Sequence, residues 1–151
     1  MAKAIKFKND TYLDSSSVVH DKNKLSDVLN TNMFNYNNWD KSQDINGNNQ
    51  TPVIISGMST TITTRGRALL VSFTLPLYHS GGTCWIRILV DGVKKYEYGY
   101  SLNGTTICSY TTIINNLSAG NHTVSVAIIR NNVATLKVVD YTSRNFTVTE
   151  I

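Results

Sequence analysis

The chain has 151 residues, of which 41% are hydrophobic and 16% charged, and its formal net charge is +4. This composition excludes an intrinsically disordered chain, and no run of about twenty apolar residues is present to span a membrane as a helix. The length favours one well-cored domain with an additional segment.

The lysines near the N-terminus form no basic run, because Lys3, Lys6 and Lys8 are separated by apolar residues and the later lysines are interleaved with aspartates. We therefore expect no binding of nucleic acid. The same stretch lacks the continuous apolar region of a secretion signal, so we expect no Sec export.

Residues 1–30 have the pattern of a polar arm. Ile5 and Phe7 alternate with lysines as in a short strand, and the apolar residues at 25–29 suffice for only one short amphipathic turn. An arm with so little apolar surface cannot fold alone. We therefore expect it to dock onto a partner or to join several copies of the chain.

Residues 31–52 are dense in asparagine and close on Pro52. Asparagine favours turns and irregular backbone because its amide competes for local backbone hydrogen bonds. This segment is therefore predicted to be a connector without long regular structure.

From residue 53 to 151 the pattern changes to two-residue alternation interrupted by turn signals, which is typical of an all-β sandwich. We predict an antiparallel, jelly-roll-like β-sandwich head, preceded by the extended arm. The predicted strands are 53–57, 59–64, 67–79, 83–90, 93–102, 105–114, 122–130, 133–140 and 145–149.

Tight reversals are expected where the sequence supplies residues that accept positive φ angles. Asp91–Gly92 and Asn103–Gly104 are typical of type I′ hairpin turns. Further reversals are plausible at Arg65–Gly66, Gly81–Gly82 and Asn131–Asn132.

Alternation also predicts which side chains form the core. The apolar set with the clearest alternation is Val71, Phe73, Leu75, Leu77, Val124, Val126 and Ile128. The segment "CWIRILV" differs, because Cys84 and Ile86 occupy one face while Trp85 and Leu89 occupy the other. A strand that is apolar on both faces is usually buried on both. One face can pack against the sandwich core, and another subunit could bury the other face.

Candidate ligand-binding residues come from two patterns. Tyr96, Tyr98 and Tyr100 share one strand face, where they can be core edge, subunit contact or a ligand platform, and Trp85 is a further flat aromatic surface. Binding residues are often found on loops. We therefore add four predicted loop residues to the candidate ligand-binding set: Tyr78, His79, Asn103 and Asn131.

No arrangement of residues argues for catalysis, so we expect no enzyme, catalytic residue, metal or cofactor. Cys84 and Cys108 lie on predicted strands without a further cysteine or histidine pair at metal-ligand spacing. Buried free thiols are the main interpretation and a disulfide is the alternative. Nothing in the spacing of Glu97 and Asp140 argues for a glycosidase pair.

Two stretches resemble known families. "KAIKFKNDTYLDSSSVVH" followed by "LSDVLN" resembles a terminal segment of minor structural and receptor-binding proteins of tailed phages that infect Gram-positive bacteria. "LSAGNHTVSVAII", at 117–129, is similar to a loop and strand of viral fibre heads and of trimeric jelly rolls of the tumour-necrosis-factor and complement type, a pattern that other β-sandwiches share.

These resemblances imply a homotrimeric fibre or tail protein of a virion, assembled in the bacterial cytoplasm. Its arm, residues 1–30, would contact other virion proteins, and its head would bind a host-surface receptor, with cell-wall polysaccharide as the expected class. Two alternatives remain open: a monomeric carbohydrate-binding module, and a capsid or tail decoration protein without receptor binding.

Overall fold

The computed structural model describes residues 5–6, 12–13, 33–38, 42–46, 51–131, 135–139 and 144–151. The chain divides into two compact units, Met1–Thr31 and Asn32–Ile151. In the first unit, β1 (Ile5–Lys6) pairs antiparallel with β2 (Tyr12–Leu13). The other expectations for the arm lie outside the described residues.

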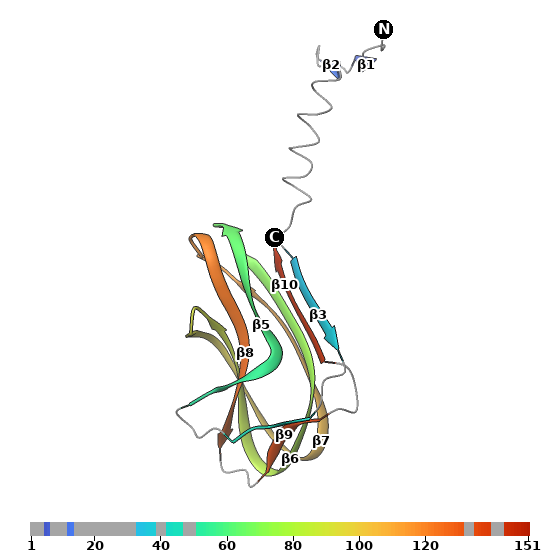
Figure 1. Ribbon diagram of the computed structural model, residues 1–151, viewed down its shortest axis with the longest axis vertical. Coiled ribbons are helices and arrows are strands. Elements are labelled where there is room, and N and C mark those ends of the chain that lie inside the picture. Colours follow the sequence, from blue (N-terminus) through green and yellow to red (C-terminus); the bar gives the residue numbers. More distant parts are fainter. Residues whose placement is uncertain are drawn as a thin grey trace. The chain divides into compact units, whose positions relative to one another are not determined.

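The second unit is all-β in its described part, as predicted, with every strand pair antiparallel. Eight strands form one continuous sheet (Figure 1). They are β3 (Met33–Asn38), β4 (Gln43–Asp44), β5 (Val53–Arg65), β6 (Leu69–Val90), β7 (Val93–Ile114), β8 (Ala119–Asn131), β9 (Leu136–Val138) and β10 (Arg144–Glu150).

Two long strands, β6 and β7, carry this sheet through a curl and divide it into two halves (Figure 1). Half-sheet A contains β3, β10, β9 and β4, which pairs with β9, together with residues 69–79 of β6 and 104–114 of β7. Half-sheet B contains β5 and β8, with residues 83–90 of β6 and 93–101 of β7. The two halves face each other as the layers of a sandwich.

The glycines expected to reverse the chain instead bend it. The pairing of β6 with β7 continues past Asn103 and Gly104, which lie opposite Ser80 and His79, and its register shifts between Ser80 and Thr83. The glycines at the bend have positive φ angles, 93° at Gly81, 96° at Gly82 and 102° at Gly104. Positive φ serves a β-bulge as well as a hairpin turn, so the predicted reversals at Gly81–Gly82 and Asn103–Gly104 are wrong.

Two strands, β3 and the short β4, arise in the segment that we expected to have no long regular structure. Residues Met33–Asn38, inside the asparagine-rich segment, form β3 and pair with β10 along their whole length. Because Phe34 and Tyr36 alternate with neighbouring asparagines, the segment has the two-residue period of a strand. Pairing at a sheet edge overrides the low strand propensity of asparagine.

The core lies between the two half-sheets and contains every predicted core residue. Phe73 and Phe146 are buried in it on neighbouring strands, where they lie directly opposite each other. Leu89, on the other face of β6, is only 7% exposed within this single chain. The second apolar face of "CWIRILV" therefore needs no further subunit to cover Leu89.

The predicted turn at Asp91–Gly92 is confirmed as the hairpin between β6 and β7, with φ angles of 52° and 76°. Asp91 also fastens this hairpin to β8. Its Oδ1 accepts a hydrogen bond from the Thr123 amide at 2.8 Å, and its Oδ2 lies 2.7 Å from His122 Nδ1. The other ring nitrogen of His122 lies 2.9 Å from the Ser118 carbonyl oxygen.

Both ring nitrogens of His122 face oxygens that only accept hydrogen bonds, so the protonated imidazolium fits this site best. The hydrogen bond with Asp91 and the one with the Ser118 carbonyl raise the pKa of His122 above its ordinary value of 6.5. The same hydrogen bond from His122, with that from the Thr123 amide, lowers the pKa of Asp91 below 3.8. Lys95 is the other charged group that acts on both residues.

These shifts predict a pH-dependent melting temperature. The contribution of His122 is fully present below about pH 6.5 and is lost as the pH rises through its raised pKa. That of Asp91 is present above about pH 4 and is lost as the pH falls through its lowered pKa. Thermal melts should therefore give a higher melting temperature at pH 5.5 than at pH 8.5.

Asp91→Asn is the matched control, because asparagine accepts the positive φ of the turn but carries no charge. Its melting temperature should change less between the two pH values than that of the wild type. Parallel profiles for the two proteins would show that the Asp91–His122 pair contributes nothing to the pH dependence.

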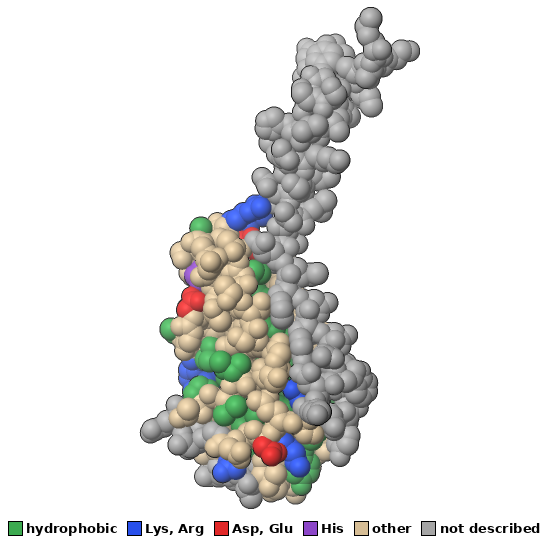
Figure 2. Space-filling view, in the orientation of Figure 1, with side chains coloured by type: hydrophobic (Ala, Val, Ile, Leu, Met, Phe, Trp, Pro, Cys, Tyr) green, Lys and Arg blue, Asp and Glu red, His purple; other side chains and the backbone are tan. Residues whose placement is uncertain are grey.

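The face of the molecule drawn in Figure 2 carries few charged side chains, which are scattered among uncharged ones. Among the described residues, no helix is both long and apolar enough to cross a membrane.

Candidate functional site

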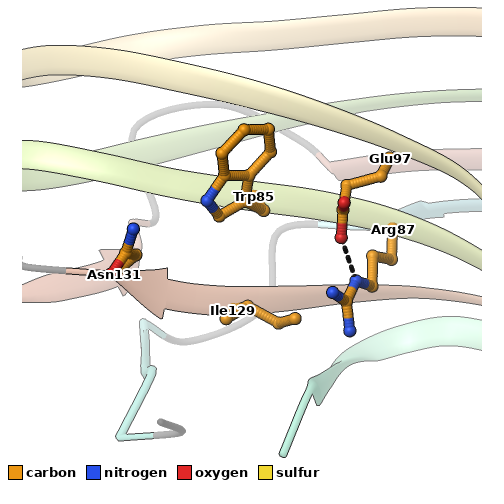
Figure 3. A pocket seen from close by; sticks show the side chains of 5 residues that line it. All are labelled: Trp85, Arg87, Glu97, Ile129 and Asn131. Atoms are coloured by element: carbon orange, nitrogen blue, oxygen red, sulfur yellow. Dashed lines mark hydrogen bonds and ion pairs between the residues drawn. The ribbon is translucent and has the colours of Figure 1, made fainter. Parts of the chain in front are cut away.

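A groove of about 200 Å³ lies on the outer face of half-sheet B (Figure 3). It crosses three neighbouring strands, with β6 between β7 and β8. Its lining residues are Trp85 and Arg87 of β6, Glu97 of β7, and Ile129 and Asn131 of β8.

Strand alternation and register bring these side chains together. Because the alternate residues of β6, from Cys84 to Val90, are buried in the core, Trp85 and Arg87 face outward. In the register of the sheet, Arg87 lies directly opposite Glu97, and Trp85 directly opposite Ile129. Three segments that are distant in the sequence therefore supply one surface.

Trp85 lies against the backbone of β7 at Gly99, its partner in the register. A Cβ atom at position 99 would lie 2.7 Å from one carbon of the indole and 3.1 Å from two others. Because Gly99 has no side chain, the indole fits against the backbone of β7. Trp85 is still 36% exposed. The result is a flat apolar platform fixed to the sheet.

Gly99→Ala is expected to displace this platform without unfolding the domain. The added methyl group overlaps the indole, a side chain that can move, and alanine is intrinsically easier to order in a strand than glycine. In proton–nitrogen correlation NMR spectra, the indole N–H signal assigned to Trp85 through Trp85→Phe should shift. Ser101→Ala, two residues further along β7, should leave that signal in place; equal spectra for both variants would contradict the role of Gly99.

Beside the indole, the carboxylate of Glu97 pairs with two cations, Arg87 and Lys94. Arg87 Nε donates a hydrogen bond to Glu97 Oε2, and Lys94 Nζ donates to Glu97 Oε1 at 3.1 Å. Partial burial opposes ionisation of Glu97, but the hydrogen bonds from Arg87 and Lys94 outweigh it and lower the pKa of the carboxyl. At neutral pH the carboxyl group of Glu97 is therefore ionised, and both of its oxygens accept hydrogen bonds.

Of the predicted site residues, the structure brings Trp85 and Asn131 into the groove. The prediction missed Arg87, Glu97 and Ile129. Arg87 was detectable, because alternation within "CWIRILV" places it on the same face as Trp85. Glu97 and Ile129 require the register of the neighbouring strands, which no local pattern supplies.

The predicted tyrosine ladder lies on the opposite, inner face of β7, partly buried against the core. Tyr96 donates a hydrogen bond from its hydroxyl to the Ile113 carbonyl oxygen at 2.8 Å, and the Tyr98 ring lies against that of Tyr110. Burial raises the pKa of Tyr98 and of Tyr100 to about 12. These contacts join the two halves of β7 and favour the core-edge alternative.

The four predicted loop residues all lie within strands, so their assignment to loops is wrong. His79 belongs to the core face of β6 and is completely buried, and neither of its ring nitrogens has a hydrogen-bond partner among the described residues. Asn103 is exposed at the bend of β7, and Lys137 Nζ lies 5.7 Å from the ring centroid of Tyr78. For Tyr78, His79 and Asn103 the cause of the error is the merging of predicted short strands into β6 and β7, whereas Asn131 is the last residue of β8.

Cys84 and Cys108 are buried free thiols, as the main interpretation predicted. Burial raises the pKa of Cys84 to about 11 and that of Cys108 to about 12. Both are therefore protonated and weakly nucleophilic at neutral pH. Within the described ranges, no group of three or more histidine, cysteine, aspartate or glutamate side chains is placed to hold a metal ion.

Comparison with known proteins gives no family. No protein-family model matches the chain, and no curated protein matches it. The resemblance of the N-terminal segment to phage proteins consequently stays a prediction.

Many solved structures are weakly similar, and they include carbohydrate-binding modules. A CBM36 module in complex with calcium and xylotriose has 10% identity and a TM-score of 0.45, over 76% of this chain and 97% of that one. The CBM36-1 domain of a multidomain xylanase from the hindgut metagenome of Trinervitermes trinervoides has 16% identity and a TM-score of 0.39, over 80% and 98%. A family 35 module from Clostridium thermocellum has 10% identity and a TM-score of 0.36, over 79% and 92%.

Proposed function

We propose that Asn32–Ile151 is a carbohydrate-binding domain whose site is the groove around Trp85. The observation that carries this proposal is the exposed indole held against Gly99 between polar side chains. A pyranose ring presents C–H groups on its faces and hydroxyls on its rim. It therefore matches an aromatic platform with hydrogen-bonding groups at its edges.

Binding without chemistry is the role that these polar groups suit. Both oxygens of Glu97 already accept hydrogen bonds from cations, and its pKa is lowered, so the carboxyl is a poor general acid. Arg87 and Asn131 can donate hydrogen bonds to sugar hydroxyls. The groove thus supports recognition of a glycan rather than its hydrolysis.

Titration calorimetry of the full chain against a panel of soluble glycans tests the proposal. The panel should include cello-oligosaccharides, chito-oligosaccharides and solubilised bacterial cell-wall polysaccharide. Saturable binding of one glycan that is inhibited by another glycan of the same class would support the proposal. Absence of heat and of competition across the panel at millimolar concentration would overturn it.

A second candidate is the predicted homotrimeric virion component. The observation that favours it is the outer face of half-sheet A, where Ile107 is 57% and Ile113 is 42% exposed. Between them, Thr111 and Ser109 form cross-strand hydroxyl contacts of 3.0 and 2.9 Å with β6. The sequence from 98 to 121 contains no charged residue that would oppose self-association.

The solution mass of the full chain tests this second candidate. Sedimentation equilibrium at micromolar concentration should give three times the chain mass if the protein is a trimer. A monomer under these conditions would contradict the oligomer and leave the carbohydrate-binding proposal intact.

A further inference from the structure

We propose that the groove binds a short, linear, uncharged oligosaccharide that runs along β6, and that Asn131 contacts the sugar next to the one stacked on Trp85. This inference rests on the proposed function. It adds the shape and charge class of the ligand and gives Asn131 a specificity-determining role.

The order of side chains along the groove is the first argument. Asn131 lies opposite Thr83 in the register, and Glu97 lies opposite Arg87. Trp85 sits between these two polar ends (Figure 3). The apolar platform thus occupies the middle of the groove, with one polar group on each side.

The distance between these ends exceeds one sugar ring. Positions 83 and 87 are four residue steps apart along β6, which corresponds to about 13 Å of strand. A single pyranose stacked on the indole can therefore contact only one polar end. Simultaneous contact with Asn131 and with the Arg87–Glu97 pair requires at least two linked units that follow the strand direction.

The charge of the groove is the second argument. Arg87 and Glu97 neutralise each other within the groove. Lys94 also contacts Glu97, but it does not line the groove and half of its side-chain surface is exposed. An anionic sugar would have to compete with Glu97 for Arg87. A neutral sugar needs only the remaining guanidinium donors and the Asn131 amide, so the site favours uncharged units.

The test is a chain-length series measured by titration calorimetry on the full chain. The probes are glucose with cello-oligosaccharides of two to four units, and N-acetylglucosamine with chito-oligosaccharides of two to four units. In at least one series, affinity should rise about fivefold or more from the monosaccharide to the di- or trisaccharide, and then level off. Glucuronic acid should bind no more tightly than glucose.

Two variants then test whether Asn131 causes the increase in affinity with chain length. Asn131→Ala should remove most of the increase in affinity with chain length. Asn103→Ala, which changes an exposed asparagine of β7 outside the groove, should match the wild type.

The two proposals fail in different ways. Binding that is independent of chain length, or a loss in Asn131→Ala that is equal for all lengths, would overturn this inference while the carbohydrate-binding function stands. No binding in either series would overturn this inference, and the carbohydrate-binding function would fall with it only if cell-wall polysaccharide also failed to bind.

Discussion

Trp85→Ala should weaken glycan binding by roughly 30-fold or more, which corresponds to the loss of about 2 kcal/mol at a binding hot spot. The indole is the largest apolar surface in the groove, and alanine leaves a sugar ring nothing to stack on. Because Trp85 is 36% exposed and lies outside the core cluster, the melting temperature should fall only slightly. Titration calorimetry and thermal melts of the same samples provide both values.

Two variants control for this result. Trp85→Phe keeps an aromatic ring of smaller area and should retain intermediate affinity. Ile107→Ala removes an apolar side chain that is 57% exposed on half-sheet A, outside the groove, and should leave binding unchanged. Undiminished binding by Trp85→Ala would reject the groove as the site, even if the domain binds glycans elsewhere.

Tyr98→Ala should have the opposite profile, with a stability loss of roughly 2–4 kcal/mol and near-normal glycan affinity of the folded protein. Tyr98 packs against the core and the Tyr110 ring, and burial raises the pKa of its hydroxyl to about 12. Truncation leaves a cavity where the two halves of β7 meet. Urea unfolding followed by far-ultraviolet circular dichroism measures the free energy of unfolding.

Tyr98→Phe distinguishes the ring from the hydroxyl. It keeps the packing and should cost less than half of the loss in Tyr98→Ala. If Tyr98→Ala were as stable as the wild type but unable to bind glycans, the ladder would be the ligand platform and the inner-face assignment would be wrong.

Local pattern in the sequence determined the fold class and most of the core. Alternation from Val71 to Leu77 predicted four side chains that the structure buries, because a strand with one covered face must repeat every two residues. The Asp91–Gly92 turn was equally local, since its two positive φ angles depend on the residues at the turn itself. These features need no knowledge of distant parts of the chain.

Only the tertiary structure decided how the strands connect and which aromatic face is outside. Asn103–Gly104 has the sequence of a hairpin turn, yet these residues lie opposite Ser80 and His79 in a bend of β7. The positive φ of Gly104 bends the strand there while its pairing with β6 continues. Trp85 and Tyr98 look alike as members of alternating strands, and sequence cannot tell which face a sheet will curl around. The groove itself depends on register, since Asn131 reaches it through the pairing of β8 with β6, and such pairing is set by the packing of the whole sheet.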